Sequence, residues 1–200
     1  MPGRRGRHVA DRQIGAEHSL AAVLEGDFGF DPPGFGAGIE RLDEALIAFG
    51  DGRDFVTALI NIDLEAVGNW AERRSLAYAS YQELAGNELV YDLVQGCIDQ
   101  ANRDLAAEPS LAASQIRRFL ILHKELDADD GELTRTRKVR RSVIGEKYGD
   151  IVTAIYAGRP EIDIDTLIRF QDGTTQRVQT TLAVVDLDAA EPGPVTMAAE

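Results

Sequence analysis

Runs of apolar residues separated by helical patterns predict two buried strands with helices between them. Residues 55–62, Phe-Val-Thr-Ala-Leu-Ile-Asn-Ile, are β-branched and apolar, which is typical of a buried strand. Residues 116–123, which follow the breaker Pro109, have the same character and predict a second core strand. Asp63 and Asn87 stand where each can cap a helix, because their side-chain oxygens accept from free backbone N–H groups.

The helical periodicity is strongest after Asn87, where apolar residues recur at every fourth position. Cys97 lies within this stripe, so we expect it to be a buried apolar side chain and not a nucleophile. A further amphipathic helix is expected from Val139 to Tyr156. The inward residues expected after Asn87 are Leu89, Leu93, Cys97, Ala101 and Leu105, beside Val90, Val94 and Ile98.

Residues 1–45 have a different character from the rest and are interpreted as a divergent N-terminal segment. Its breakers, Asp31 to Gly38, predict a loop. A phosphate-binding loop is the alternative at Gly34–Gly38, but the glycine spacing fits neither the dinucleotide nor the Walker pattern. Directly after this loop, the spacing of apolar residues predicts a helix. Its stripe is Ile39, Leu42, Ala45, Leu46 and Phe49.

The C-terminal part predicts a β-hairpin followed by a tail. Ile162–Phe170 and Arg177–Asp186 are the expected strands, with a turn at 171–174. The expected fold class is α+β: a small mixed sheet flanked by amphipathic helices, with the hairpin appended. The expected divisions are 1–45, a main domain at 46–157, the hairpin extension at 158–188 and a flexible tail at 189–200.

Composition favours an ordinary globular domain with an acidic surface. The chain has 200 residues, 44% of them hydrophobic, and a formal net charge of -13. Such a charge argues against non-specific binding to nucleic acid or to anionic membranes. One cysteine and the lack of a secretory signal or of a long apolar run indicate a cytoplasmic protein with no transmembrane segment, and peripheral membrane contact stays open.

Charge inverts within residues 125–141, where five acids precede five bases. The acidic half does not fit an EF-hand starting at Asp127, because its glycine comes one position early and Lys138 stands where the bidentate Glu belongs. We interpret it as a solvated turn and predict no metal site. The acids are Glu125, Asp127, Asp129, Asp130 and Glu132, and the bases are Arg135, Arg137, Lys138, Arg140 and Arg141.

The basic half has two interpretations. A lysine on a turn, beside hydroxyls and guanidinium groups, is suited to neutralising a phosphate as a mobile point charge. Alternatively, this is the start of a helix whose arginines are simply solvated. His123 offers no competing site, because His8 and His18 lie in the divergent N-terminal segment and a metal site or catalytic triad needs converging partners.

Residues 131–141, Gly-Glu-Leu-Thr-Arg-Thr-Arg-Lys-Val-Arg-Arg, resemble the C-terminal signature of AMP-forming long-chain acyl-CoA synthetases, which are adenylate-forming ligases. That signature typically runs Gly-Glu-Leu-Thr-Pro-Thr-x-Lys-x-Lys/Arg-Arg. The similarity extends over residues 46–156 and includes Phe49–Arg53, Ala58–Asp63 and Gln115–Phe119. Residues 162–186 are similar to a hairpin that some bacterial members carry. The resemblance thus makes 46–157 the C-terminal lid domain of such an enzyme.

The resemblance implies a two-step reaction in which fatty acid and ATP give an acyl-adenylate and pyrophosphate, and CoA then releases AMP to form acyl-CoA. The lid rotates between the two steps, and its motif lysine, here Lys138, acts in the first. Arg135 replaces a common proline. The resemblance makes Thr134 and Thr136 the residues that shape the turn, and the candidate substrate or nucleotide contacts are Thr134, Thr136, Arg137, Arg140 and Arg141.

The family's phosphate loop, adenine-binding segment and hinge are not found in residues 1–45. We therefore expect an N-terminally truncated chain that cannot adenylate a fatty acid alone and that depends on an N-terminal adenylation fragment as partner. ATP and Mg would be bound mainly by that absent domain, and CoA would enter as a substrate. The alternative is a non-catalytic remnant or a small interaction domain in which Lys138 meets no substrate.

Overall fold

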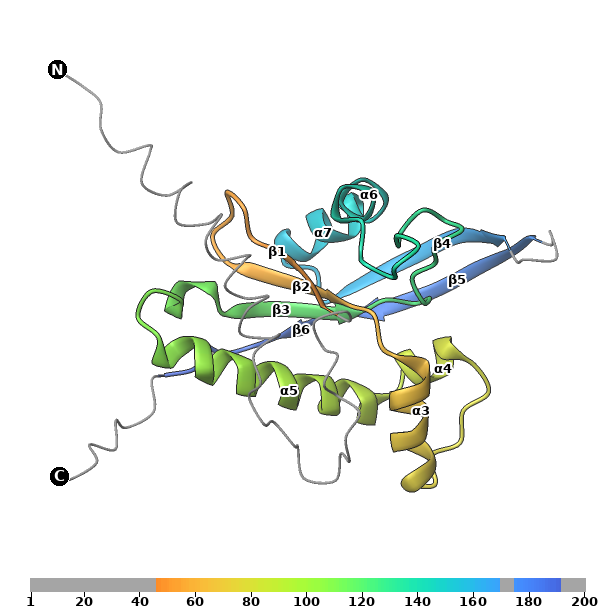
Figure 1. Ribbon diagram of the computed structural model, residues 1–200, viewed down its shortest axis with the longest axis horizontal. Helices are drawn as coiled ribbons and strands as arrows, with labels where there is room; N and C mark the ends of the chain where they lie inside the picture. The colour runs from red at the N-terminus through yellow and green to blue at the C-terminus, as the bar shows by residue number, and fades with distance from the viewer. Residues whose placement is uncertain (1–45, 170–174, 192–200) are drawn as a thin grey trace, which may run out of the picture.

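The computed structural model describes residues 46–169 and 175–191, and its centre is a mixed four-stranded sheet (Figure 1). The neighbouring strands β2 (Val56–Ile60) and β3 (Ile116–Ile121) run parallel, whereas β1 (Leu46–Phe49) and β6 (Val185–Asp186) are antiparallel to their neighbours. The two predicted core strands therefore form the middle of the sheet. Its order is β1, β2, β3 and β6.

Strand β1 corrects the prediction of a helix with Leu46 and Phe49 on its stripe. Leu46 and Ala48 pack on one face of the sheet, and Ile47 packs on the other. A helix with one apolar stripe could not bury three consecutive residues in this way, whereas a strand points alternate side chains to opposite faces. The rest of the predicted helix, the loop at 31–38, the turn at 171–174 and the end of the tail lie outside the described residues.

Three helices pack on one face of the sheet: α3 (Leu64–Arg73), α4 (Tyr81–Ala85) and α5 (Glu88–Ala107). Both predicted caps form, because Asp63 accepts from the Ala66 N–H at 2.9 Å and Asn87 accepts from the Leu89 N–H at 2.9 Å. Figure 1 shows α5 running along the sheet below β3. Side chains in this core include Trp70, Leu84, Val90, Ile98, Leu105, Phe119 and Ile121.

The buried face of α5 is rotated from the predicted one. Leu89 is 50% exposed, although the spacing placed it first on the apolar stripe. Val90, Val94 and Ile98, which the sequence placed beside that stripe, are buried, and Cys97 is buried as predicted. Asn102 is also buried, on the same face as Ile98 and Leu105. Two adjacent stripes of apolar residues follow the helical spacing in this segment, so spacing alone does not determine which of them faces the sheet.

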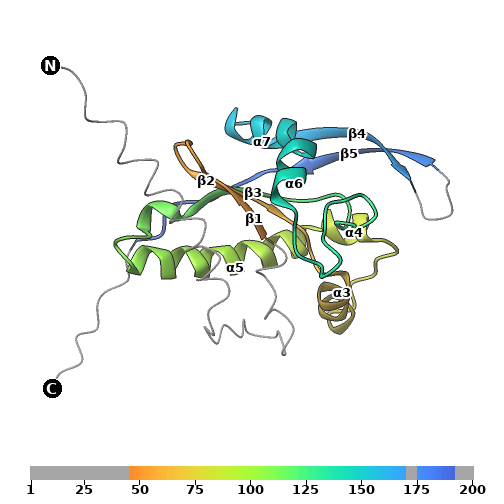
Figure 2. The ribbon, with the colours of Figure 1, turned by 45° about the horizontal axis from the view of Figure 1, so that its top comes forward.

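The opposite face of the sheet carries α6 (Arg141–Lys147) and α7 (Gly149–Tyr156), as Figure 2 shows. The single helix predicted from Val139 to Tyr156 is therefore wrong in two respects. Val139 forms a β-bridge with Leu133 and cannot be helical, and Tyr148, with ψ of 11°, interrupts the helix before Gly149. No helix in the described ranges is long and apolar enough to cross a membrane.

A two-stranded hairpin of β4 (Glu161–Arg169) and β5 (Thr175–Ala183) follows α7. Its base packs on the same face as α7, with Ile162, Leu182 and Val184 in that core. The predicted second strand was too long, because the chain leaves the hairpin at Val184 and joins the main sheet as β6. A mixed sheet, flanking helices and an appended hairpin confirm the predicted α+β class.

Candidate active site

The candidate lysine lies on a tight turn that Thr134 closes. The Thr134 N–H donates to the Lys138 carbonyl at 2.8 Å, and its Oγ1 accepts from the Lys138 N–H at 3.0 Å. The Arg137 N–H also donates to the Thr134 carbonyl at 2.9 Å. The bridge between Leu133 and Val139 continues this pairing below the turn. A threonine at 134 thus fixes the backbone on both sides of the turn.

Lys138 presents an unpaired ammonium group to solvent. Its side chain is exposed, and the structure records no ion pair or hydrogen bond between its Nζ and any described residue. The chain's other two lysines differ, because Lys124 and Lys147 both form ion pairs with Glu132 and Asp130. Among the residues that the structure describes, Lys138 is therefore the lysine whose charge remains available to a ligand.

The predicted neighbours of Lys138 are gathered only in part. Thr136 lies within the turn, and its Oγ1 is 3.0 Å from Thr134 Oγ1. Arg137 has φ of 61° and its guanidinium group points to Glu125, 3.8 Å away. Arg140 and Arg141 are exposed at the start of α6, where Arg140 is tied to the turn by its backbone. The structure records no contact between these two guanidinium groups and the Lys138 ammonium group.

Glu132 corrects the interpretation of the acidic half as a solvated turn. Its side chain is completely buried, with a relative exposure of 0%. One oxygen accepts from Lys124 Nζ at 2.8 Å and from the Asp127 N–H at 3.0 Å. The other accepts from Lys147 Nζ at 2.9 Å and from the Tyr148 hydroxyl at 2.9 Å. Four donors can hold a buried carboxylate in its ionised form.

The electrostatics of this cluster follow from its contacts. Burial by itself would raise the pKa of Glu132, but hydrogen bonds from Lys124, the Asp127 N–H and Lys147 outweigh it and leave the pKa below its usual value. The pKa of Lys124 is raised, because its bonds to Asp130 and Glu132 exceed the opposing effect of burial. Burial, together with the negative charge of Glu132, raises the pKa of the Tyr148 hydroxyl. At neutral pH Glu132 is therefore ionised, whereas Lys124 and Tyr148 keep the protons that they donate to it.

Several known proteins are similar to this chain. Long-chain-fatty-acid–CoA ligase FadD15 of Mycobacterium tuberculosis is 34% identical over 143 residues, which cover 71% of this chain and 22% of the ligase. The putative fatty-acid–CoA ligase fadD11 of the same organism is 32% identical over 119 residues, 58% of this chain and 20% of that protein. Long-chain-fatty-acid–CoA ligase ACSBG1 of Bos taurus is 30% identical over 98 residues, 48% of this chain and 13% of the ligase.

This chain is a relative of the long-chain fatty-acid–CoA ligases. The resemblance inferred from residues 131–141 is confirmed at that level, and the role of Lys138 stays a prediction. The chain spans 22% of the length of FadD15.

No protein-family model matches the chain. A solved structure that is similar to this chain is the A-PCP didomain of carboxylic acid reductase from Segniliparus rugosus, in complex with AMP. The match covers 70% of this chain and 16% of the didomain chain, with 17% sequence identity. Its TM-score of 0.41 is too low to support a statement about fold or function.

Two further side chains that could carry chemistry, His123 and Cys97, are buried in this protein outside the candidate site. His123 is 6% exposed, and its two ring nitrogens have no hydrogen-bond partner among the described residues. Burial and the positive charge of Lys124 lower the pKa of His123. Burial raises the pKa of the Cys97 thiol to about 11. Within the described ranges, no group of three or more His, Cys, Asp or Glu side chains lies close enough to hold a metal ion.

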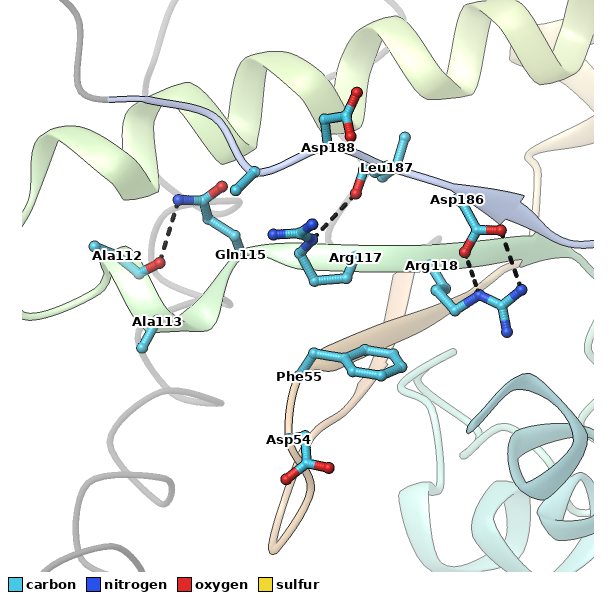
Figure 3. Close-up of a pocket in the computed structure, with 11 residues that line it drawn as sticks. Asp54, Phe55, Ala112, Ala113, Gln115, Arg117, Arg118, Asp186, Leu187 and Asp188 are labelled. Atoms are coloured by element: carbon cyan, nitrogen blue, oxygen red, sulfur yellow. Dashed lines mark hydrogen bonds and ion pairs between the residues drawn. The ribbon is translucent and has the colours of Figure 1, made fainter. Parts of the chain in front are cut away.

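A separate pocket of about 570 Å³ lies between β3 and the segment after β6 (Figure 3). The Arg118 guanidinium group in the wall of this pocket already has partners within the protein. It pairs with Asp186 at 2.5 Å and also donates to the Ile155 and Arg159 carbonyls. Arg117 likewise donates to the Leu187 carbonyl at 3.1 Å. None of its lining residues belongs to segment 127–141, so this pocket is distinct from the turn of Lys138.

The sequence singled out the turn but missed the residues beneath it. Lys124 and Lys147 gave a usable signal, because the chain has just three lysines among 21 basic residues and all three fall between 124 and 147. Tyr148 lies within the predicted amphipathic helix 139–156, and it is buried. The sequence does not show that these side chains meet at Glu132, because they are brought together only by the folding of the chain between β3 and α6.

Proposed function

We propose that this chain is the C-terminal, lysine-bearing lid part of a long-chain fatty-acid–CoA ligase. The reaction joins fatty acid and ATP to an acyl-adenylate with release of pyrophosphate, and CoA then displaces AMP to give acyl-CoA. The observation that carries the proposal is the exposed Lys138 ammonium group, which pairs with no residue that the structure describes, on a turn fixed by Thr134. The ligase names of its relatives support the choice of reaction.

Lys138 has the properties that adenylation requires. Attack of a carboxylate on the α-phosphate builds negative charge on phosphate oxygens, and a positioned cation stabilises that charge most strongly where water is excluded. An ammonium group that is already paired would first have to break its ion pair, but Lys138 forms none with residues 46–169 or 175–191. Arg140 and Arg141 add positive charge nearby and are accessory in this scheme.

The remaining parts of the reaction belong to a partner module. Fatty acid, ATP and Mg would be held mainly by an adenylation domain, with CoA entering for the second step. Lys138 would approach the adenylate site when that domain and this one close on each other. The chain alone is therefore expected to give no adenylation, and its partner would be an N-terminal adenylation fragment.

A chimera with a full-length relative tests the proposal. In FadD15, the 143-residue segment that matches this chain is replaced by the corresponding residues of this chain, and ATP–pyrophosphate exchange is measured with palmitate. We expect exchange by the chimera and none by the isolated chain. Lys138→Ala in the chimera should lower the exchange rate roughly 100-fold or more, as removal of one stabilising charge or donor does in other active sites.

The matched control is Arg73→Ala, which removes an exposed charge from α3 and should leave the exchange unchanged. Exchange by the isolated chain would contradict its need for a partner. A folded chimera that is inactive, or one that Lys138→Ala does not affect, would instead support a non-catalytic remnant or interaction domain.

A further inference from the structure

Glu132 is connected to both arms of the turn that carries Lys138. Its backbone carbonyl accepts from the Arg140 N–H at 2.8 Å, so it pairs with the chain directly after the turn. The residue that follows it, Leu133, forms the bridge to Val139. Any displacement of Glu132 would therefore move both arms together, and Lys138 with them.

The Glu132 side chain joins this pair of arms to the body of the domain. Lys124 comes from the segment after β3, Asp127 from the loop that follows, and Lys147 and Tyr148 from the end of α6. The turn itself lies at the surface, where Arg135, Thr136, Arg137 and Lys138 are all exposed. Apolar packing therefore contributes little at the tip. Below it the arms are held by the buried Glu132 carboxylate and by Leu133 and Val139, which pack on the core that includes Ile144.

We infer that Glu132 is a positioning residue for Lys138, which it holds at a fixed place on the domain surface through the paired arms 132–134 and 138–140. This rests on the proposed function, because it gives a catalytic purpose to the order of the turn. A lysine that must enter another domain's site gains from a turn that is already ordered, since a misplacement of about 1 Å can cost about 100-fold in rate. The carboxylate acts at a distance and touches no substrate.

A purely structural role for Glu132 would give a different result. In that case its loss would weaken the whole domain, and the turn would open only when the domain unfolds. Under the positioning role, the turn opens locally while the sheet stays closed. Backbone amide exchange separates the two, because it reports each opening at the residue where it happens.

The experiment compares the wild-type chain with Glu132→Gln, which has nearly the same shape but no charge. Exchange is followed by NMR at the Thr134, Lys138 and Arg140 amides, which are bonded across the turn, and at Leu122, which is bonded to Ile60 in the sheet. We expect the turn amides to exchange about tenfold faster or more, with Leu122 unchanged. The control is Glu146→Gln, an exposed glutamate on α6, which should change neither set.

Two milder variants keep the inference testable if Glu132→Gln does not fold. Lys147→Met and Tyr148→Phe each remove one of the four donors. Each should accelerate the turn amides by a smaller factor and leave Leu122 unaffected. Equal exchange in all variants, or acceleration by one factor at the turn and in the sheet, would overturn the positioning role.

The FadD15 chimera gives the catalytic readout. Glu132→Gln should lower kcat for adenylation and leave KM for ATP near its original value, because Glu132 touches no nucleotide under this scheme. A rise in KM alone would contradict it. The exchange measurement needs no activity, so it stands if the chimera proves inactive. A third outcome separates the two proposals. If Lys138→Ala lowers the adenylation rate but Glu132→Gln leaves the exchange of the turn amides unchanged, the proposed function stands and the positioning role is rejected.

Discussion

Asn102 of α5 and Ile116 of β3 exchange two hydrogen bonds of 2.8 Å inside the domain. The Asn102 amide group donates to the Ile116 carbonyl and accepts from the Ile116 N–H, as a neighbouring strand would. The Asn102 side chain is 1% exposed. A side chain on the helix therefore satisfies the backbone of the first residue of β3 and ties the two elements together.

Asn102→Ala should cost about 2–6 kcal/mol of unfolding free energy, because it leaves two buried backbone groups without partners at about 1–3 kcal/mol each. Urea denaturation followed by circular dichroism measures this loss. Asn69→Ala is the control, since Asn69 is exposed on α3, and it should stay within about 0.5 kcal/mol of the wild type. A loss below about 1 kcal/mol for Asn102→Ala would show that water replaces the amide group.

The contrast between Asp63 and Asn102 shows which contacts the sequence could predict. Asp63 caps a helix that starts at the next residue, so a local rule was enough to assign its partner. Asn102 lies among the apolar residues of α5, and its partner, Ile116, becomes available only when β3 packs beside the helix. Glu132 was misjudged for the same reason, because its lysine partners lie 8 and 15 residues away. The turn of Lys138 could be singled out because its motif is continuous.

Arg137 has φ of 61° at the tip of the turn, a left-handed backbone conformation that costs a residue with a side chain roughly 1–2 kcal/mol. Arg137→Gly should therefore raise the unfolding free energy by about 0.5–1 kcal/mol after the greater freedom of unfolded glycine is subtracted. Urea denaturation at moderate salt tests this, because salt screens the exposed pair between Arg137 and Glu125.

Arg135→Gly is the matched control for this change. Arg135 is exposed on the same turn, and its φ is not positive. Glycine there should only add freedom to the unfolded chain and so lower the unfolding free energy, by up to about 1 kcal/mol. If both variants lose stability equally, the left-handed conformation of Arg137 carries no strain.

Cys97 should resist thiol reagents in the folded protein. Its side chain is 6% exposed, and burial raises the pKa of the thiol to about 11, so almost no reactive thiolate forms at neutral pH. We expect iodoacetamide to modify Cys97 at a rate that follows the unfolded fraction in urea. The reference is a short peptide with the same cysteine. Fast modification without urea would mean that α5 opens locally around Cys97.

His123 and Glu132 should reduce stability in two different ranges of acid pH. Burial, followed by the charge of Lys124, lowers the pKa of His123 from its ordinary 6.5. The unfolded chain then binds this proton more readily than the folded one, so the unfolding free energy falls as the pH falls below 6.5. The pKa of Glu132 lies below its ordinary 4.5, so its stabilising effect is complete above that pH and is lost as the pH falls through its folded-state pKa.

Replacement of His123 by leucine isolates the first of these ranges. Leucine has a similar volume and needs no hydrogen-bond partner, whereas both His123 ring nitrogens are buried without one among the described residues. His123→Leu should therefore lose less stability than the wild type between pH 7.5 and pH 5.5, when both are measured by urea denaturation. Below about pH 4.5 the two should fall in parallel, because the stabilising effect of the ionised Glu132 is then lost in both. Glu132→Gln should show the reverse, keeping the loss near pH 6 and reducing the loss below pH 4.5, to which Asp130 also contributes because Lys124 lowers its pKa. Parallel curves for His123→Leu and the wild type throughout would mean that the His123 ring reaches water and titrates normally.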